Sequence, residues 1–247
     1  MPTGPSTKLV PDAMATDADR LRRIARQHVE TTGLLGVDFM PVRPVETQAA
    51  ALEAQAAALE ALRSRHDAEC PHCTTATGHT RTVFGEGSPD AALMFVGEAP
   101  GLEEDQTGRP FVGRAGQMLD KIIKAMGLRR QDVYIANVLK SRPPDNRTPL
   151  PTEVDACSPF LAEQIRVIRP TVLVSLGNPS TKFLLRTSSG ITKLRGHWAT
   201  YTDGTLSIPL MPTFHPAYLL RNYTENTRRE VWSDMQAVMQ RLGICAE

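Results

Sequence analysis

Two cysteines separated by two residues, Cys70 and Cys73, form the most explicit chemical pattern in the chain. The 247 residues contain only two more cysteines, Cys157 and Cys245. The N-terminus lacks the apolar segment of a secretory signal, so we do not expect a disulfide framework. Thiols at this spacing therefore indicate metal binding or redox chemistry, and four cysteines would suffice for one complete metal site.

A second group of polar side chains follows predicted strands. Glu98, Asn137 and His215 each stand at or just after the end of a short apolar run. Parallel strands end at a common edge, where ligands of such sheets bind. We therefore expect a carboxylate, an amide and an imidazole side by side, which together could bind and activate a polar ligand.

The segment 97–116, GEAPGLEEDQTGRPFVGRAG, connects the first of these runs to a predicted helix. Its five glycines permit tight turns and close approach of the backbone to a ligand. It also contains a further carboxylate, Glu104, and one aromatic residue, Phe111. Each side chain alone has a structural explanation as a helix cap, a turn residue or part of the core, but their convergence favours a ligand site.

Apolar runs alternate along the chain with segments of helical periodicity. The strands are predicted at 91–96, 132–138, 171–176 and 209–213, and the helices at 115–126, 152–168, 179–186 and 226–242. This alternation predicts a parallel sheet covered by helices on both faces.

The residues before the cysteine pair differ in composition. The heptad QAAALEA occurs twice from Gln48, which puts Leu52 and Leu59 on one face of a helix. The repeat predicts an Ala-rich helix on the domain surface, and a coiled coil that binds a partner is the alternative. We therefore divide the chain into an N-terminal extension, 1–66, and a main domain, 67–247.

Composition and charge exclude several classes of protein. Hydrophobic residues make up 41% of the chain, enough for a substantial core, and the formal net charge is +1. No run approaches the roughly 18–20 apolar residues of a membrane span, so we expect a cytoplasmic protein without a membrane partner. The charge excludes a wholly basic nucleic-acid-coating protein, but seven basic residues less two acidic ones give the segment 121–150 a local charge of +5.

Taken together, these motifs resemble the uracil-DNA glycosylase superfamily, and most closely its iron–sulfur-containing branch, family 4. The matching stretches are CPHC (70–73), VFGEGSPDAALMFVGEAPG (83–101), GRPFVGRAGQMLD (108–120), NVLKSRPPDNRTPLP (137–151), ACSPFLAEQIRVIRP (156–170), LVSLG (173–177) and HPAYLLR (215–221). The resemblance implies a three-layer α/β/α fold with a four-stranded parallel sheet. It also implies a monomeric, monofunctional enzyme that flips uracil out of DNA and hydrolyses its N-glycosidic bond in base-excision repair.

The resemblance assigns roles to the residues at the strand ends. Phe111 would stack on the flipped base, and Asn137 would pair with N3–H and O4 of uracil. His215 would stabilise the charge that develops on O2. Glu98 and Glu104 are the carboxylates that would position or activate water, and the sequence does not rank them.

Further contacts are implied for the backbone and for the DNA. The substrate-binding backbone is expected at Gly97, Pro100 and Gly101. The expected DNA contacts are Lys140, Arg142, Arg147, Leu219, Leu220 and Arg221, with the leucines as wedges that fill the gap left by the flipped base. The alternative for the two leucines is that they face the core.

The metal site departs from the family pattern. The resemblance implies a [4Fe–4S] cluster on four cysteines, of which Cys70, Cys73 and Cys157 are present. The remaining family cysteine is replaced by Ser141, and Cys245 lies outside the pattern. Three possibilities stay open: a cluster completed by Ser141 or water, a cluster completed by Cys245, or a different metal or none. A cluster here would be structural, because glycosidic hydrolysis requires no redox step.

Two alternative functions remain from the sequence. One is a catalytically weak or inactive DNA-binding relative, which the serine at position 141 and the long extension would favour. The other is a glycosylase for another altered base, such as hypoxanthine or hydroxymethyluracil.

Overall fold

The computed structural model describes residues 23–24, 26–27 and 47–244. The chain divides into two units, 1–46 and 47–247, of which the second contains the sheet and nearly all described helices. Cys245, one of the possible metal ligands, lies outside the described residues.

Six strands form one sheet in the order β1-β3-β2-β4-β6-β5. They are β1 (Glu86–Gly87), β2 (Leu93–Gly97), β3 (Tyr134–Asn137), β4 (Val172–Leu176), β5 (Ala199–Asp203) and β6 (Leu206–Thr213). The predicted parallel strands are the four central ones, and the four-stranded sheet is extended by β1 and β5, which pair antiparallel at its edges. The sequence did not predict these two edge strands because β1 has only two residues and β5 is largely polar.

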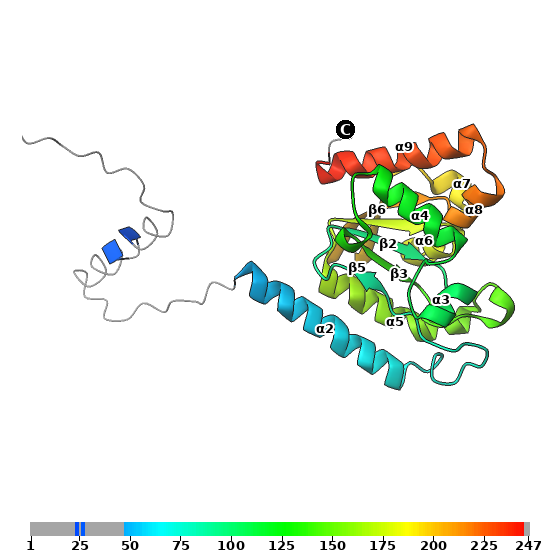
Figure 1. Cartoon of the computed structure of the whole chain (residues 1–247), viewed down its shortest axis with the longest axis horizontal. Coiled ribbons are helices and arrows are strands. Elements are labelled where there is room, and N and C mark those ends of the chain that lie inside the picture. Colours follow the sequence, from blue (N-terminus) through cyan, green and yellow to red (C-terminus); the bar gives the residue numbers. More distant parts are fainter. Residues whose placement is uncertain (1–22, 25, 28–46, 245–247) are drawn as a thin grey trace, which may run out of the picture. The chain divides into compact units, whose positions relative to one another are not determined.

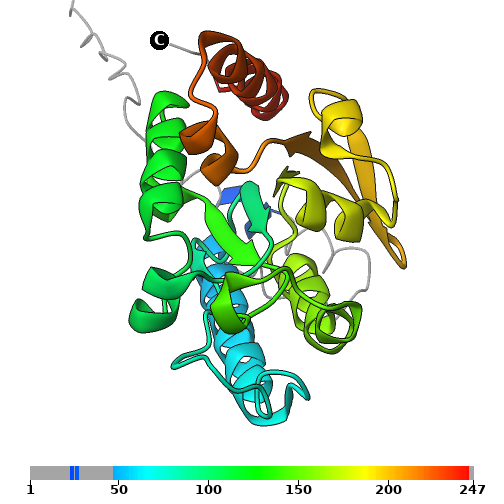
Figure 2. The same cartoon turned by 90° about the vertical axis from the view of Figure 1, so that its right-hand side faces the viewer.

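Helices cover both faces of the sheet. They are α2 (Gln48–Glu69), α3 (Leu102–Thr107), α4 (Arg114–Ala125), α5 (Pro151–Ile168), α6 (Asn178–Leu185), α7 (Ile191–Leu194), α8 (Pro216–Arg221) and α9 (Glu225–Leu242), with 3-10 turns η1 (Arg130–Asp132) and η2 (Pro144–Asn146). Figure 1 shows α4 and α9 above the sheet and α2 and α5 below it, and Figure 2 shows the same layers after a quarter turn. Among the described residues, no helix combines the length and apolar character needed to cross a bilayer.

The alternation of strand side chains produces these layers. In β2, Phe95 packs with the residues of α4 and α9, whereas its neighbour Met94 packs with those of α5. All five residues of β2 and of β4 are buried, as expected for central strands covered on both faces.

The Ala-rich helix α2 packs against α5 and belongs to the same compact unit as the sheet. Leu59 and Leu62 are buried, and the Gln55 side chain donates a hydrogen bond of 3.2 Å to the carbonyl of Val167. The compact unit therefore begins at Thr47, twenty residues before the boundary expected from the sequence.

Docking of α2 can be tested by truncating its buried leucines. We expect Leu62→Ala to lower the free energy of unfolding by about 2–5 kcal/mol, because the side chain is only 6% exposed. Leu52→Ala is the matched control on the same helix, where 38% exposure predicts a change within about 0.5 kcal/mol. Denaturant unfolding measures both, and equal small effects would show that α2 does not pack on the domain.

Candidate active site and metal centre

An open cavity of about 690 Å³ lies at the carboxyl ends of the parallel strands. Glu98 follows β2 directly, Asn137 is the last residue of β3, and His215 stands two residues after β6. All three line the cavity, as does Gly177 at the end of β4. The topology thus brings together the carboxylate, amide and imidazole expected from the sequence.

Asn137 lines this cavity and carries an unsatisfied acceptor. Its side chain is 1% exposed, and its Oδ1 has no hydrogen-bond partner among the described residues. The neighbouring Gly97 is paired with Asn137 across the parallel strands. A Cβ at position 97 would lie 2.3 Å from Asn137 Oδ1 and 2.6 Å from Cζ of Phe111, so only glycine leaves room for both side chains.

Phe111 is held in an unusual backbone conformation beside the cavity. Its φ of 51° is a left-handed value that costs a residue other than glycine roughly 1–3 kcal/mol. The Arg130 guanidinium donates to the carbonyls of Pro110 and Phe111 and pairs with Asp120, which holds this turn in place. The Phe111 ring lies 5.6 Å from that of His215, centroid to centroid.

The tautomer of His215 follows from its position at the start of α8. Its Nδ1 accepts a 3.1 Å hydrogen bond from the backbone N–H of Ala217. A neutral ring that accepts at Nδ1 carries its hydrogen on Nε2. Burial, with the charge of Arg221, lowers the pKa of His215 to about 4, opposed by the charge of Glu104. The ring is therefore a neutral donor at neutral pH.

The two carboxylates have different surroundings. Glu104 Oε1 accepts hydrogen bonds of 2.9 Å from the N–H groups of both Val112 and Gly113, and Oε2 accepts one of 3.1 Å from Gly101. Glu104 thereby ties the two arms of the glycine-rich segment together. Glu98 also lines the cavity, and no hydrogen bond of its side chain to the described residues ties it to the glycine-rich segment. Burial raises the pKa of its carboxyl group.

The mouth of the cavity is lined by part of the expected DNA-contact set. Arg147 and Arg221 are exposed there, with Arg147 in a two-point ion pair with Glu153. Pro100 and Gly101 also line the cavity. Tyr218, which the sequence reasoning missed, stands at the mouth with 37% of its side chain exposed.

The structure corrects the DNA-binding role expected for Lys140. Its side chain is completely buried, and its Nζ donates to the carbonyl of Asn137 at 2.8 Å and to Oε1 of Gln164. Burial lowers the pKa of Lys140 to about 8. A phosphate cannot reach this group, so Lys140 supports the strand end that carries Asn137.

The wedge role expected for Leu219 is also wrong. Leu219 is 3% exposed and packs with Phe214 and Val231, because the first turn of α8 points it inward. Leu220 is half-buried and lies outside the cavity lining. Arg142 is half-buried as well and donates from Nε to Asn146.

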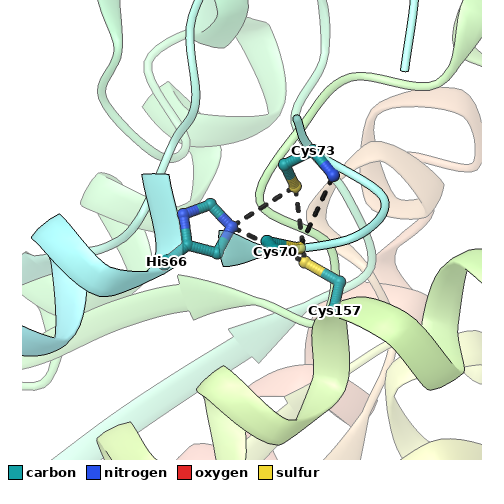
Figure 3. Close-up of side chains that lie close together, drawn as sticks. All are labelled: His66, Cys70, Cys73 and Cys157. Carbon is teal, nitrogen blue, oxygen red and sulfur yellow. Dashed lines mark hydrogen bonds between the residues drawn. The ribbon is translucent and has the colours of Figure 1, made fainter. Parts of the chain in front are cut away.

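Side chains of the kinds that bind metals form a second cluster, at the C-terminal end of α2. Cys70 and Cys73 follow that helix, and Cys157 lies in α5. Figure 3 shows the three sulfurs converging with the imidazole of His66, and the four ligand atoms lie within 4.8 Å of one another. All four residues are buried, and the group is compatible with a metal cluster.

His66 was missed because the expected domain boundary placed it in the extension. The signal was present in the spacing, since His66 precedes Cys70 by four residues, about one helical turn. Ser141, at the position of the missing family cysteine, is buried, and its Oγ accepts a 3.4 Å hydrogen bond from the Cys73 thiol.

Comparisons with known proteins agree with this geometry. A family model described as the uracil DNA glycosylase superfamily matches residues 84–236. The type-4 uracil-DNA glycosylase of Thermotoga maritima is 47% identical over 169 residues, which cover 68% of this chain and 86% of that protein. The type-4 uracil-DNA glycosylase of Sulfurisphaera tokodaii is 44% identical over 176 residues, which cover 69% of this chain and 79% of that protein. A type-5 uracil-DNA glycosylase of Pyrobaculum aerophilum is 30% identical over 176 residues, which cover 65% of this chain and 75% of that protein.

The neutral state of His215 can be measured directly. We expect its imidazole to titrate near pH 4, well below the ordinary value of 6.5, because burial disfavours the charged ring. NMR of the isotope-labelled histidines gives the titration curve, and His215→Gln identifies the signal by its loss. A midpoint at or above 6.5 would contradict the neutral donor.

Proposed function

The chain belongs to the uracil DNA glycosylase superfamily, and we propose that it removes uracil from DNA by hydrolysing the N-glycosidic bond, the first step of base-excision repair. The observation that carries this proposal is the unpartnered Asn137 Oδ1, buried in a cavity that also holds a neutral imidazole donor. A buried acceptor without a partner is available to a ligand that brings a donor.

The amide of Asn137 distinguishes uracil from cytosine. Its Oδ1 would accept from the N3–H of uracil while its NH₂ group donates to O4. Cytosine presents an acceptor and a donor in the opposite order at the same edge, so both hydrogen bonds would be lost. Each unpaired buried group costs about 1–3 kcal/mol. The Phe111 ring at the cavity wall provides a face on which the flipped base stacks.

Cleavage places negative charge on the uracil and positive charge on the sugar. His215 donates from Nε2 to O2 of the leaving base, and its low pKa keeps it a hydrogen-bond donor rather than a charged acid. Glu98, which lines the cavity, positions the attacking water and stabilises the sugar cation. Glu104 acts as a positioning residue through the glycine-rich segment.

DNA approaches the mouth of the cavity, where Arg147, Arg221 and Tyr218 are exposed. The two arginines offer contacts to phosphate, and the tyrosine offers an aromatic surface beside the opened base pair. We propose that the protein acts as a monomer in the cytoplasm.

We further propose that a [4Fe–4S] cluster is bound under α2. The three buried cysteines Cys70, Cys73 and Cys157 supply the thiolates that iron–sulfur clusters require. Bound there, the group would supply a cross-link between the end of α2, the following loop and α5. The backbone N–H of Lys140 donates to Cys157 Sγ at 3.2 Å while its Nζ donates to Asn137, so this cross-link also supports the proposed uracil-binding residue.

The activity is tested with an oligonucleotide that carries one uracil. Excision followed by alkaline strand cleavage is expected for the unchanged chain. His215→Ala should lower the single-turnover rate by about 10²–10³-fold, the usual loss for one donor to a developing charge. Asn137→Ala should lower it strongly as well and reduce the preference for uracil over cytosine.

Asn226→Ala is the control for the asparagine, because Asn226 is exposed on α9 and lies outside the cavity. It should cleave at the unchanged rate. Binding of the oligonucleotide without any excision would refute the proposed function and favour the inactive relative, whereas equal rates for all variants would refute the assigned residues.

The cluster is tested on protein purified without oxygen. We expect visible absorbance near that of iron–sulfur proteins, with iron and acid-labile sulfide bound in nearly equal amounts. Cys157→Ala should abolish the absorbance, because it removes a thiolate from the middle of α5. A colourless, iron-free chain with native circular dichroism would contradict the iron–sulfur proposal.

A further inference from the structure

We propose that His66 is the fourth protein ligand of the metal centre and replaces the cysteine that is absent at position 141. The inference rests on the proposed metal centre and is independent of the excision chemistry. It concerns a side chain on α2, outside the stretches in which the sequence resembles family 4.

The imidazole stands at ligand distance from the thiols. His66 Nε2 lies 3.3 Å from Cys73 Sγ and 4.0 Å from Cys157 Sγ, and these two sulfurs are 3.7 Å apart. Around one tetrahedral ion, metal bonds of about 2.3 Å to sulfur and 2.1 Å to nitrogen place neighbouring ligand atoms about 3.6–3.8 Å apart. The three separations quoted scatter around these values, and Cys70 Sγ completes a group of four ligand atoms that lie within 4.8 Å of one another.

The orientation of the ring is fixed by its other nitrogen. His66 Nδ1 lies 2.8 Å from Oδ1 of Asp67, and a carboxylate can only accept, so Nδ1 carries the hydrogen. The same Oδ1 accepts a 2.8 Å hydrogen bond from the hydroxyl of Thr82, which holds the carboxylate. Histidines that bind metals usually donate their second N–H to a carboxylate in this way. The remaining nitrogen, Nε2, points at the sulfurs (Figure 3).

Packing holds the imidazole of His66 against the thiols. His66 is completely buried on the face of α2 that also buries Leu59 and Leu62. The edge of its ring meets Phe160 at 4.9 Å, centroid to centroid. Burying an imidazole costs free energy unless both nitrogens are satisfied, and a metal satisfies the one that faces the thiols.

Ser141 is the competing fourth ligand, and its contacts fit a different role. Its hydroxyl accepts from the Cys73 thiol and lies beside the cluster of ligands. An imidazole is a common metal ligand, whereas an un-ionised hydroxyl is a weak one. With His66 in place the donor set is one nitrogen and three sulfurs, and a cysteine at position 141 is not required.

This donor set suits either an iron–sulfur cluster or a single tetrahedral ion such as Zn²⁺. Sulfurs 3.7 Å apart are in contact, so a cluster requires the four side chains to move apart, whereas a single ion does not. The His66 assignment is common to both, and metal and sulfide analysis distinguishes them.

The test compares His66→Ala, Ser141→Ala and His66→Cys in the full chain purified without oxygen. Iron, zinc and acid-labile sulfide are measured per chain before and after challenge with a chelator. We expect His66→Ala to lose metal at least about tenfold more readily, Ser141→Ala to behave as the unchanged chain, and His66→Cys to restore retention. Asp67→Asn should weaken retention by about 10–100-fold through the ring orientation.

X-ray absorption at the metal edge of the unchanged chain supplies a readout that needs no variant. One nitrogen neighbour is expected, and it should be replaced by sulfur in His66→Cys. Metal loss in Ser141→Ala with full retention in His66→Ala would overturn the proposal, as would a coordination shell without nitrogen. A chain that excises uracil but binds no metal would also overturn it while leaving the proposed function intact.

Discussion

A buried amide oxygen without a partner costs about 1–3 kcal/mol, and the rest of the site is arranged to keep Asn137 in that condition. The parallel pairing of β2 with β3 sets Asn137 opposite Gly97, whose missing side chain leaves space for the amide. From below, the ammonium group of Lys140 bonds the carbonyl of the same residue. The backbone is thus fixed on two sides, while the amide oxygen stays free for a ligand.

Lys140 also joins the cavity to the metal centre. Its backbone N–H donates a hydrogen bond to the sulfur of Cys157, and its side chain donates one to the carbonyl of Asn137. Lys140 alone therefore connects the two sites. The cation is itself buried, and Gln164 completes its hydrogen bonding from α5. Movement of α5 or loss of the thiol contacts would therefore reach the backbone of Asn137. The thiol group and the cavity are therefore coupled through hydrogen bonds of one residue.

Periodicity was enough to predict the four central strands, the helices between them and the convergence of Glu98, Asn137 and His215, because fully buried strands and amphipathic helices leave strong patterns. It could not predict which way a side chain turns within a short element. Leu219 points inward because α8 starts at Pro216, with His215 as its N-cap, and its six residues turn Leu219 toward Phe214 and Val231. His66 was missed because the expected boundary placed it in the N-terminal extension, whereas α2 continues to Glu69 and buries it.

The formal charge summed over a stretch of sequence likewise overstates the unpaired charge at the surface. The segment 121–150 carries a formal +5, yet Lys140 is buried, Arg129 is paired with Asp132, and Arg147 is paired with Glu153. Arg130 is likewise bound to Asp120 and near Glu86. The pairs carry little net charge, so they add little to the field that attracts a polyanion.

What remains of that charge is concentrated on one helix. Lys121 and Lys124 are exposed on α4, with no ion pair found for either within the described residues. Helix α4 packs against α8, whose last residue, Arg221, is exposed at the mouth of the cavity. The unpaired positive charge of this part of the chain therefore lies on the side of the cavity where Arg221, together with burial, lowers the pKa of His215.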